Sequence, residues 1–72
     1  MTPPIHICNQ IRKHLTAQKR SVAWLSQQLG CDPSALRKTL KKPYISTDLL
    51  YRISELLDKD FFVYYSRRLG EK

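Results

Sequence analysis

The chain is poor in several residue types, and each shortage excludes a class of structure. Its 72 residues include only two glycines and two cysteines. Cys8 and Cys31 lack the further cysteines of a disulfide framework or a zinc ribbon. No uncharged run approaches the length of a membrane span, and Arg12 and Lys13 interrupt the apolar N-terminal stretch. We therefore expect reduced thiols, no signal peptide, no membrane association and a cytoplasmic location.

The sequence lacks the residue patterns that are typical of a metal site, a cofactor site or a catalytic site. His6, Cys8 and His14 are close in sequence, but their spacing matches no zinc pattern and no second cysteine lies nearby. The chain also lacks a glycine-rich phosphate loop, a pair of acids sharing a site and a base placed beside either cysteine. A domain this short has little room for a sheltered pocket. We expect no enzyme activity, no metal site and no small-molecule cofactor.

Acidic residues are scarce, and the basic excess lies in one half of the chain. The formal net charge is +7. Residues 1–42 contain eight lysines and arginines against the single acid Asp32, whereas residues 43–72 contain five of each sign. A polyanionic partner would therefore bind the first half of the chain. A basic face that serves only solubility would give the same distribution.

Apolar residues recur at helical spacing in five segments, and no segment alternates long enough to predict a strand. The predicted helices cover residues 5–17, 22–29, 33–42, 47–57 and 61–69, all within one domain spanning residues 1–72. The sequence therefore predicts an all-α fold. The following residues are expected to face or border its core: Ile7, Cys8, Ile11, Leu15, Gln18, Val22, Leu25, Ser26, Leu29, Leu36, Thr39, Leu40, Leu49, Leu50, Ile53, Leu56, Leu57, Phe61, Phe62, Tyr65 and Leu69.

Residues that begin and end helices support these boundaries. Ser21 and Asp32 are suited to N-cap positions, and Pro33 to the first helical position. Gly30 tolerates a positive φ and is expected to end the second helix, while Pro43 disfavours helical backbone at the residue before it. The remaining helices have their own candidate caps: Thr2 followed by Pro3 and Pro4, Ser46 or Thr47, and Asp60.

The turn at Gly30 joins two short helices in close succession, with the small residue Ser26 facing the second of them. In a helix-turn-helix motif, the second helix enters the DNA major groove and the first lies across the backbone. A corner of two helices without a ligand would have the same apolar spacing. At 100° per residue, the side of the second helix away from its leucines carries Ser34, Lys38 and Lys41, flanked by Arg37 and Lys42.

The segment SVAWLSQQLGCDPSALRKTLKKPYISTDLLYRISELL resembles the phage-repressor and Cro type of helix-turn-helix domain, the lambda-repressor-like or XRE family. The ending DLLYRISELLDKDFFVYYSRRL is similar to small one-domain regulators of this group, so the resemblance covers about residues 5–69. It implies a compact five-helix domain. Leu25, Ser26, Leu29, Gly30, Cys31 and Leu36 align without gaps on the family's inward leucine, small residue, second apolar residue, turn glycine, apolar turn residue and first core residue of the recognition helix.

The resemblance implies sequence-specific binding of double-stranded DNA, usually as a two-fold dimer on a palindromic operator, by a transcriptional regulator. Lys38 is the best base reader, since a lysine can donate to guanine O6 and N7. In the aligned positions, Pro33, Ser34 and Lys38 correspond to the family's residues that contact bases. Val22 and the loop from Lys42 to Tyr44 correspond to its residues that approach phosphates. Arg37, Lys41 and Lys42 flank the exposed face and are assigned to phosphates.

Aromatic residues crowd the C-terminal segment FFVYYSRRL, which is too aromatic to be wholly buried by so small a domain. Tyr51, Val63 and Tyr64 are expected to face away from the core. Interfaces favour exposed aromatic surface, so we expect the fifth helix to form a homodimer through Phe61, Val63 and Tyr64. Packing of this helix on its own domain is the alternative.

Two smaller expectations concern single residues of the second helix and its turn. Trp24 is expected at the edge of the core, where large aromatic residues usually pack, and Cys31 is expected to be a small core residue.

Two other functions are compatible with the same pattern. Pro33 cannot donate a hydrogen bond and Asp32 brings a negative charge toward the DNA, which favours a protein-interaction module that keeps the fold without DNA binding. The antitoxin of a toxin pair is the other alternative.

Overall fold

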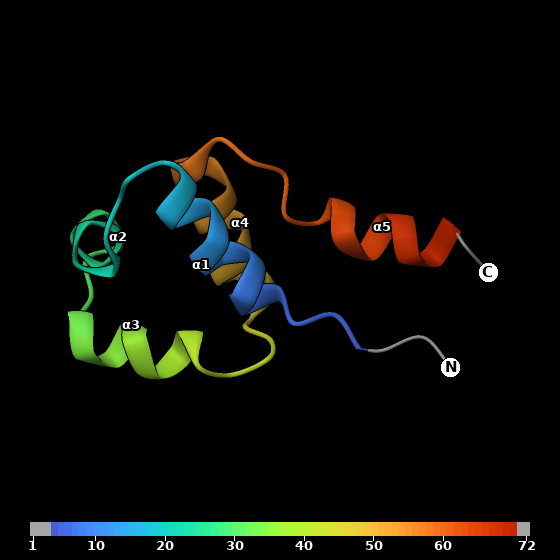
Figure 1. The fold of residues 1–72 in the computed structure, drawn as a ribbon. Coiled ribbons are helices and arrows are strands. Elements are labelled where there is room, and N and C mark those ends of the chain that lie inside the picture. Colours follow the sequence, from blue (N-terminus) through green and yellow to red (C-terminus); the bar gives the residue numbers. More distant parts are fainter. Residues whose placement is uncertain (1–3, 71–72) are drawn as a thin grey trace.

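The computed structural model describes residues 4–70, and this part of the chain contains five helices and no strand. The predicted all-α class is therefore confirmed. Thr2 and Pro3, which were expected to precede the first helix, lie outside the described residues. The helices are α1 (Ile7–Ala17), α2 (Val22–Leu29), α3 (Pro33–Leu40), α4 (Thr47–Leu57) and α5 (Val63–Gly70), as Figure 1 shows.

The caps explain why α2, α3 and α4 begin where the sequence predicts. Ser21 Oγ accepts a hydrogen bond from the N–H of Trp24 at 3.0 Å. Asp32 Oδ2 and Ser46 Oγ each accept from the N–H three residues later, at 3.2 Å. Gly30 ends α2 with φ of 74°, in the left-handed region that glycine enters without a steric cost. The turn between α2 and α3 is thus built from local interactions.

Three predicted helix ends differ from the structure by two residues. α1 begins at Ile7 because the ring of His6 caps it, accepting from the N–H of Asn9 at 3.2 Å. α3 ends at Leu40, since the next two N–H groups bond three residues back in a tightened turn before Pro43. α5 begins only at Val63: the carboxylate of Asp60 accepts from the N–H of Phe62 and holds a turn there instead of capping the helix.

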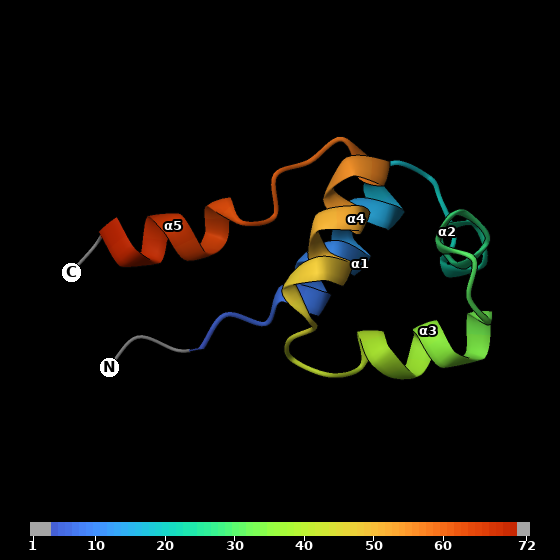
Figure 2. The same cartoon turned by 180° about the vertical axis from the view of Figure 1, so that it is seen from behind.

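Helices α1 to α4 form the body of the molecule, and α5 extends away from it beside the N-terminal segment (Figures 1 and 2). α2 packs against both α3 and α4, and α1 packs against α3. α2 is viewed nearly along its axis in Figure 1 while α3 runs across the view, so these two helices cross steeply. The projecting α5 gives the chain its longest dimension of 38 Å, against 22 Å in the other two directions.

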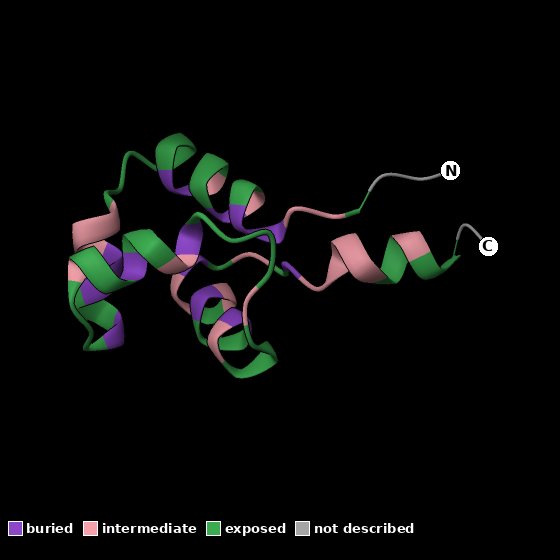
Figure 3. Cartoon of the chain, turned by 90° about the horizontal axis from the view of Figure 1, so that it is seen from below, coloured by how far each residue is buried: buried purple, intermediate pink, exposed green. Residues whose placement is uncertain are grey.

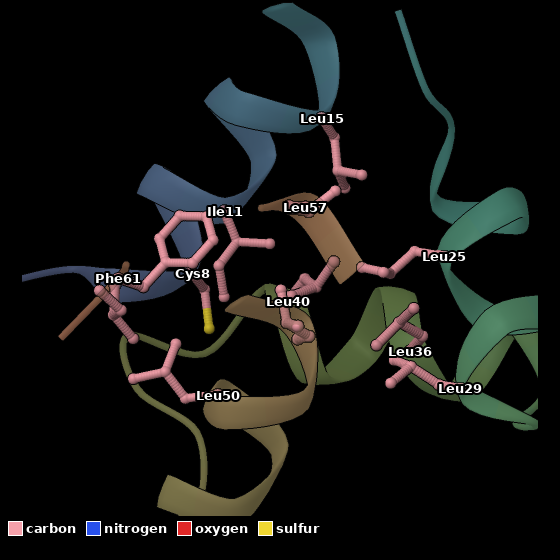
Figure 4. Close-up of a cluster of buried hydrophobic side chains, with 12 residues drawn as sticks. Cys8, Ile11, Leu15, Leu25, Leu29, Leu36, Leu40, Leu50, Leu57 and Phe61 are labelled. Atoms are coloured by element: carbon pink, nitrogen blue, oxygen red, sulfur yellow. The ribbon is translucent and has the colours of Figure 1, made fainter. Parts of the chain in front are cut away.

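The core lies between α1, α2, α3 and α4, whose buried side chains converge in Figure 4. Ser26 is fully buried, and its hydroxyl donates to the carbonyl oxygen of Ala23 at 2.8 Å. In Figure 3 the helices of the body turn buried residues inward and exposed ones toward solvent. The buried apolar residues are Ile7, Cys8, Ile11, Leu15, Leu25, Leu29, Leu36, Leu40, Leu50, Ile53, Leu57 and Phe61.

Three residues expected to face or border the core are exposed. Gln18, at the end of α1, is one of them. Cys31 follows the left-handed Gly30, and its side chain lies at the surface of the turn. Leu69 is 62% exposed because only the first part of α5 contacts the body. Leu49, Leu56, Phe62 and Tyr65 are half-buried and pack against the core, so their predicted direction is correct.

Side chains and backbone groups tie the ends of the helices together. The N–H of Ile7 donates to the carbonyl oxygen of Pro43 at 2.9 Å, so the loop after α3 is held against the start of α1. The amide of Gln18 donates to the carbonyl oxygen of Leu57 at 2.9 Å, linking the ends of α1 and α4. These bonds satisfy backbone groups at helix ends that have no partner within the helix.

The beginning of α5 is attached to α1 through aromatic contacts. The rings of Phe61 and His14 meet edge to face with 5.3 Å between centroids. The His14 Nε2 and the Tyr64 hydroxyl are 3.2 Å apart, and the Tyr64 ring stacks on Phe61.

None of the helices in residues 4–70 is long and apolar enough to cross a membrane.

Candidate nucleic-acid interface

Four exposed cations lie on the outward side of α3 and in the turn that follows it. Leu36 and Leu40 are buried on the inward side, with 3% and 2% of their surface exposed. Asp32 and Pro33 start the helix at the register that sends these leucines inward. The exposed residues on the other side and at its end are Ser34, Arg37, Lys38, Lys41 and Lys42, so the predicted burial pattern is confirmed.

α3 is fixed from behind by contacts with α1 and α2. Thr39, which was expected to face the core, is half-buried, and its hydroxyl donates to the carbonyl oxygen of Ala35 at 3.1 Å. The thiol of Cys8 on α1 lies 3.7 Å from the carbonyl oxygen of Thr39 and donates to it. The side of α3 opposite its cations therefore contacts α1 and α2.

The structure divides the residues assigned to phosphates into two groups. Val22, at the start of α2, is half-buried and lines one hollow together with Arg37 and Lys41. Lys42 and Tyr44 line a second hollow between the end of α3 and the start of α4. Tyr44 is 70% exposed, which leaves its ring and hydroxyl free for an external partner.

Of the residues assigned to bases, Ser34 and Lys38 are exposed and Pro33 is half-buried. Pro33 occupies the first turn of α3, where its ring supports the helix start. Lys38 lies one turn further along and forms no ion pair with a carboxylate in residues 4–70. Its ammonium group is therefore available to an acceptor outside the chain.

Arg12 belongs to the same surface, although the sequence analysis did not select it. This residue of α1 lines the hollow that contains Arg37 and Lys41. Nothing in the local sequence links the first helix to the third, because their contact depends on how α1 packs against α3. The excess of positive charge in residues 1–42 was the only sequence signal that included it.

Acidic residues gather at a different part of the molecule. Glu55, Asp58 and Asp60 line a hollow at the junction of α4 and α5, away from α3 in Figure 1. They make up half of the six acidic residues in the chain. Residues 32–42 contain four bases against the one acid Asp32, so the surface around α3 is net positive and favours one orientation toward a polyanion.

The residues expected at a dimer interface have different environments. Phe61 is fully buried in the core of its own chain, so the prediction that it lies at an interface is wrong. It precedes α5, and its ring packs against the rings of His14 and Tyr64 in the same chain. Val63 and Tyr64 are half-buried, whereas Tyr51 is 56% exposed.

Cys8 and Trp24 are positioned by packing. Burial raises the pKa of the Cys8 thiol, and the nearby Arg12 guanidinium opposes this shift in part. Trp24 is half-buried at the edge of the core, as predicted, with the guanidinium of Arg20 4.0 Å above its ring. Residues 4–70 contain no group of three His, Cys, Asp or Glu side chains placed to hold a metal ion.

No protein-family model, curated protein or solved structure matches the chain.

Proposed function

We propose that the protein binds double-stranded DNA in a sequence-specific manner and regulates transcription, with α3 lying in the major groove. The observation that supports this most is the division of α3 into a buried leucine side and an exposed cationic side. A major groove about 12 Å wide accepts one α-helix. α3 forms part of the molecular surface and is supported from behind by α1 and α2.

In this proposal, the exposed residues of α3 divide between bases and phosphates. Lys38 donates to the acceptor atoms of a guanine, and Ser34 and Pro33 lie nearest the bases at the start of the helix. The residues at the edges of the groove hold the backbone: Val22 through its main chain, and Arg37, Lys41, Lys42 and Tyr44 through their side chains. The affinity for DNA then depends strongly on salt.

We also propose that two copies bind together through α5. Only the first part of this helix contacts its own body, and Leu69 and Tyr51 expose apolar surface. Val63 and Tyr64, half-buried in one chain, would be covered further by a second copy. Light scattering at high micromolar concentration, with and without duplex DNA, tests this: a monomer under both conditions contradicts the dimer.

Fluorescence anisotropy with a random-sequence duplex at several salt concentrations tests DNA binding. The slope of log K against log salt should be negative, with about 0.9 for each phosphate contacted. A mixture of duplexes selected from the source genome should then contain some that bind more tightly than the random sequence. A protein-interaction module would bind no duplex even in dilute buffer, and that result would reject the proposal.

A further inference from the structure

A hollow of about 210 Å³ lies where α1, α2 and α3 meet. Its lining combines three basic side chains, Arg12, Arg37 and Lys41, with two apolar ones, Val22 and Leu40. Leu40 is 2% exposed and belongs to the core, so the inner end of the hollow is apolar and its rim is cationic. Arg12 lies on α1, whereas Arg37 lies on α3 and Lys41 is its C-cap, 25 or more positions further along the sequence.

The three positive charges of this hollow have no partner of opposite sign in the described chain. Within residues 4–70, neither Arg12, Arg37 nor Lys41 forms an ion pair with a carboxylate. Like charges brought together repel one another, and an anion placed between them removes that repulsion. The surroundings of the hollow therefore favour an anionic ligand.

The helices hold the backbone positions of these cations close together before any ligand arrives. Arg12 lies one turn after Cys8, whose thiol donates to the carbonyl oxygen of Thr39 in α3. This contact keeps the turn of α1 that carries Arg12 close to the turn of α3 that carries Arg37 and Lys41. The backbone of the two helices is then already in place, so binding has to order only the exposed side chains.

The chemistry of the hollow suits a phosphate group. Guanidinium groups donate two parallel hydrogen bonds to phosphate oxygens, and lysine adds a point charge. Val22 is the first residue of α2 and lines the same hollow, so the start of this helix, which favours an anion, lies at its edge.

We propose that this hollow binds one backbone phosphate of duplex DNA, with Arg12 of α1 completing a clamp formed by Arg37 and Lys41. The inference rests on the proposed function, because the phosphate belongs to the DNA in which α3 lies. It adds α1 to the DNA-contacting surface. Arg12 thereby fixes the angle at which α3 enters the groove, since phosphate contacts set the orientation of a protein on the duplex.

The test compares four variants by anisotropy on a random duplex between 0.1 and 1 M salt. Arg12→Gln should weaken binding by up to about eightfold at 0.1 M, the value for one released counterion, and by less than about twofold at 1 M. Arg67→Gln, an exposed cation on α5, is the matched control and should bind like the wild type. Thermal unfolding of each variant checks that the fold is kept.

Double variants test whether the cations share one phosphate. Replacing Arg12 and Lys41 together with Gln should lower the salt slope by about 0.9 in total, because only one phosphate is lost. Replacing Arg12 and Lys42, which line different hollows, should lower it by about 1.8, because two phosphates are lost. Equal binding by the Arg12→Gln and Arg67→Gln variants would overturn the clamp while leaving the proposed function intact.

Two other outcomes identify a different failure. A wild-type protein that binds no duplex rejects the proposed function itself, and the clamp with it. The guanidinium Nε–H signals of Arg12 and Arg37 can also be followed by NMR during titration with inorganic phosphate. Shifts in that titration without an effect of Arg12→Gln on duplex binding would assign the hollow to free phosphate and overturn its role in DNA binding.

Discussion

The guanidinium of Arg52 on α4 donates a hydrogen bond to the main-chain carbonyl oxygen of Leu29, with 3.1 Å between Nη2 and the oxygen. Leu29 is the last residue of α2, and Gly30 follows it in the left-handed conformation. The carbonyl groups at the end of a helix have no partner within that helix, and here a cation supplies one. The bond therefore connects α4 to the turn that sets the direction of α3.

Replacing Arg52 with Ala is expected to lower the free energy of unfolding by about 1 kcal/mol, because a charge-assisted hydrogen bond at a half-exposed site is lost. Arg52→Lys should recover only part of this, since a lysine reaches the carbonyl with less defined geometry. Urea unfolding followed by circular dichroism measures the change. Arg67→Ala on α5 is the control, and an equal loss in both variants would show that the Leu29 bond contributes nothing.

Ser26 tests how tightly α2 fits its neighbours. The side chain is fully buried where α2 packs against α3 and α4, so a larger residue has no space to occupy. Ser26→Leu is expected to cost about 1 to 3 kcal/mol through overpacking. Ser26→Ala keeps the volume and should cost less than about 1 kcal/mol, since the hydroxyl bonds only to Ala23 in its own helix.

Denaturant midpoints of the two Ser26 variants distinguish packing from hydrogen bonding. Similar losses in both would mean that the hydroxyl matters and the volume does not. The Leu variant should also bind DNA more weakly than the Ala variant at the same folded fraction, because the larger side chain displaces α3 relative to α2.

The local parts of the fold were predictable from the sequence, and the parts that depend on packing were not. Gly30 and Asp32 act through their own backbone and nearest neighbours, so their roles follow from residue type. The exposure of Cys31 depends on how the turn lies over α2 and α3. Leu69 was expected inside because the apolar residues of α5 recur at helical spacing. That spacing does not reveal that the end of the helix extends beyond the body of the molecule.

The candidate site divides in the same way. The exposed side of α3, including Lys38, follows from the positions of two leucines at helical spacing. Arg12 joins this side only through the packing of α1 on α3, between segments that are far apart in sequence. A contact of that kind has no signal in a single sequence.

Stability should fall in alkaline solution because of Cys8. Burial keeps the pKa of this thiol above its ordinary value of 9.0 in the folded chain, and the pKa of Tyr65 is raised from 10.0 in the same way. The folded protein thus binds these protons more tightly than the unfolded protein does. Their contribution to stability is complete below about pH 9. It is lost as the pH rises through the pKa values that the two groups have in the folded protein.

Urea midpoints measured from about pH 8 to 10.5 check this dependence. Cys8→Ala should be less stable than the wild type at pH 8 but should lose less stability over the range. Cys31→Ser is the matched cysteine variant for comparison, since this thiol lies at the surface. A thiol reagent at pH 8 should modify Cys31 quickly and Cys8 only on unfolding; rapid modification of both would contradict the burial of Cys8.

Lys38 and Lys41 lie on the same exposed side of α3 but should affect DNA binding differently. Lys41→Ala removes a phosphate contact, so it should weaken binding to all duplexes alike and lower the salt slope by up to about 0.9. Lys38→Ala should instead reduce the preference at one base pair by about 1 to 3 kcal/mol, because a base contact is lost. Anisotropy with a selected duplex and its single-base-pair variants measures both effects. If neither substitution changes binding to any duplex that the wild type recognises, then α3 is not the recognition helix, and the DNA must be contacted by another surface.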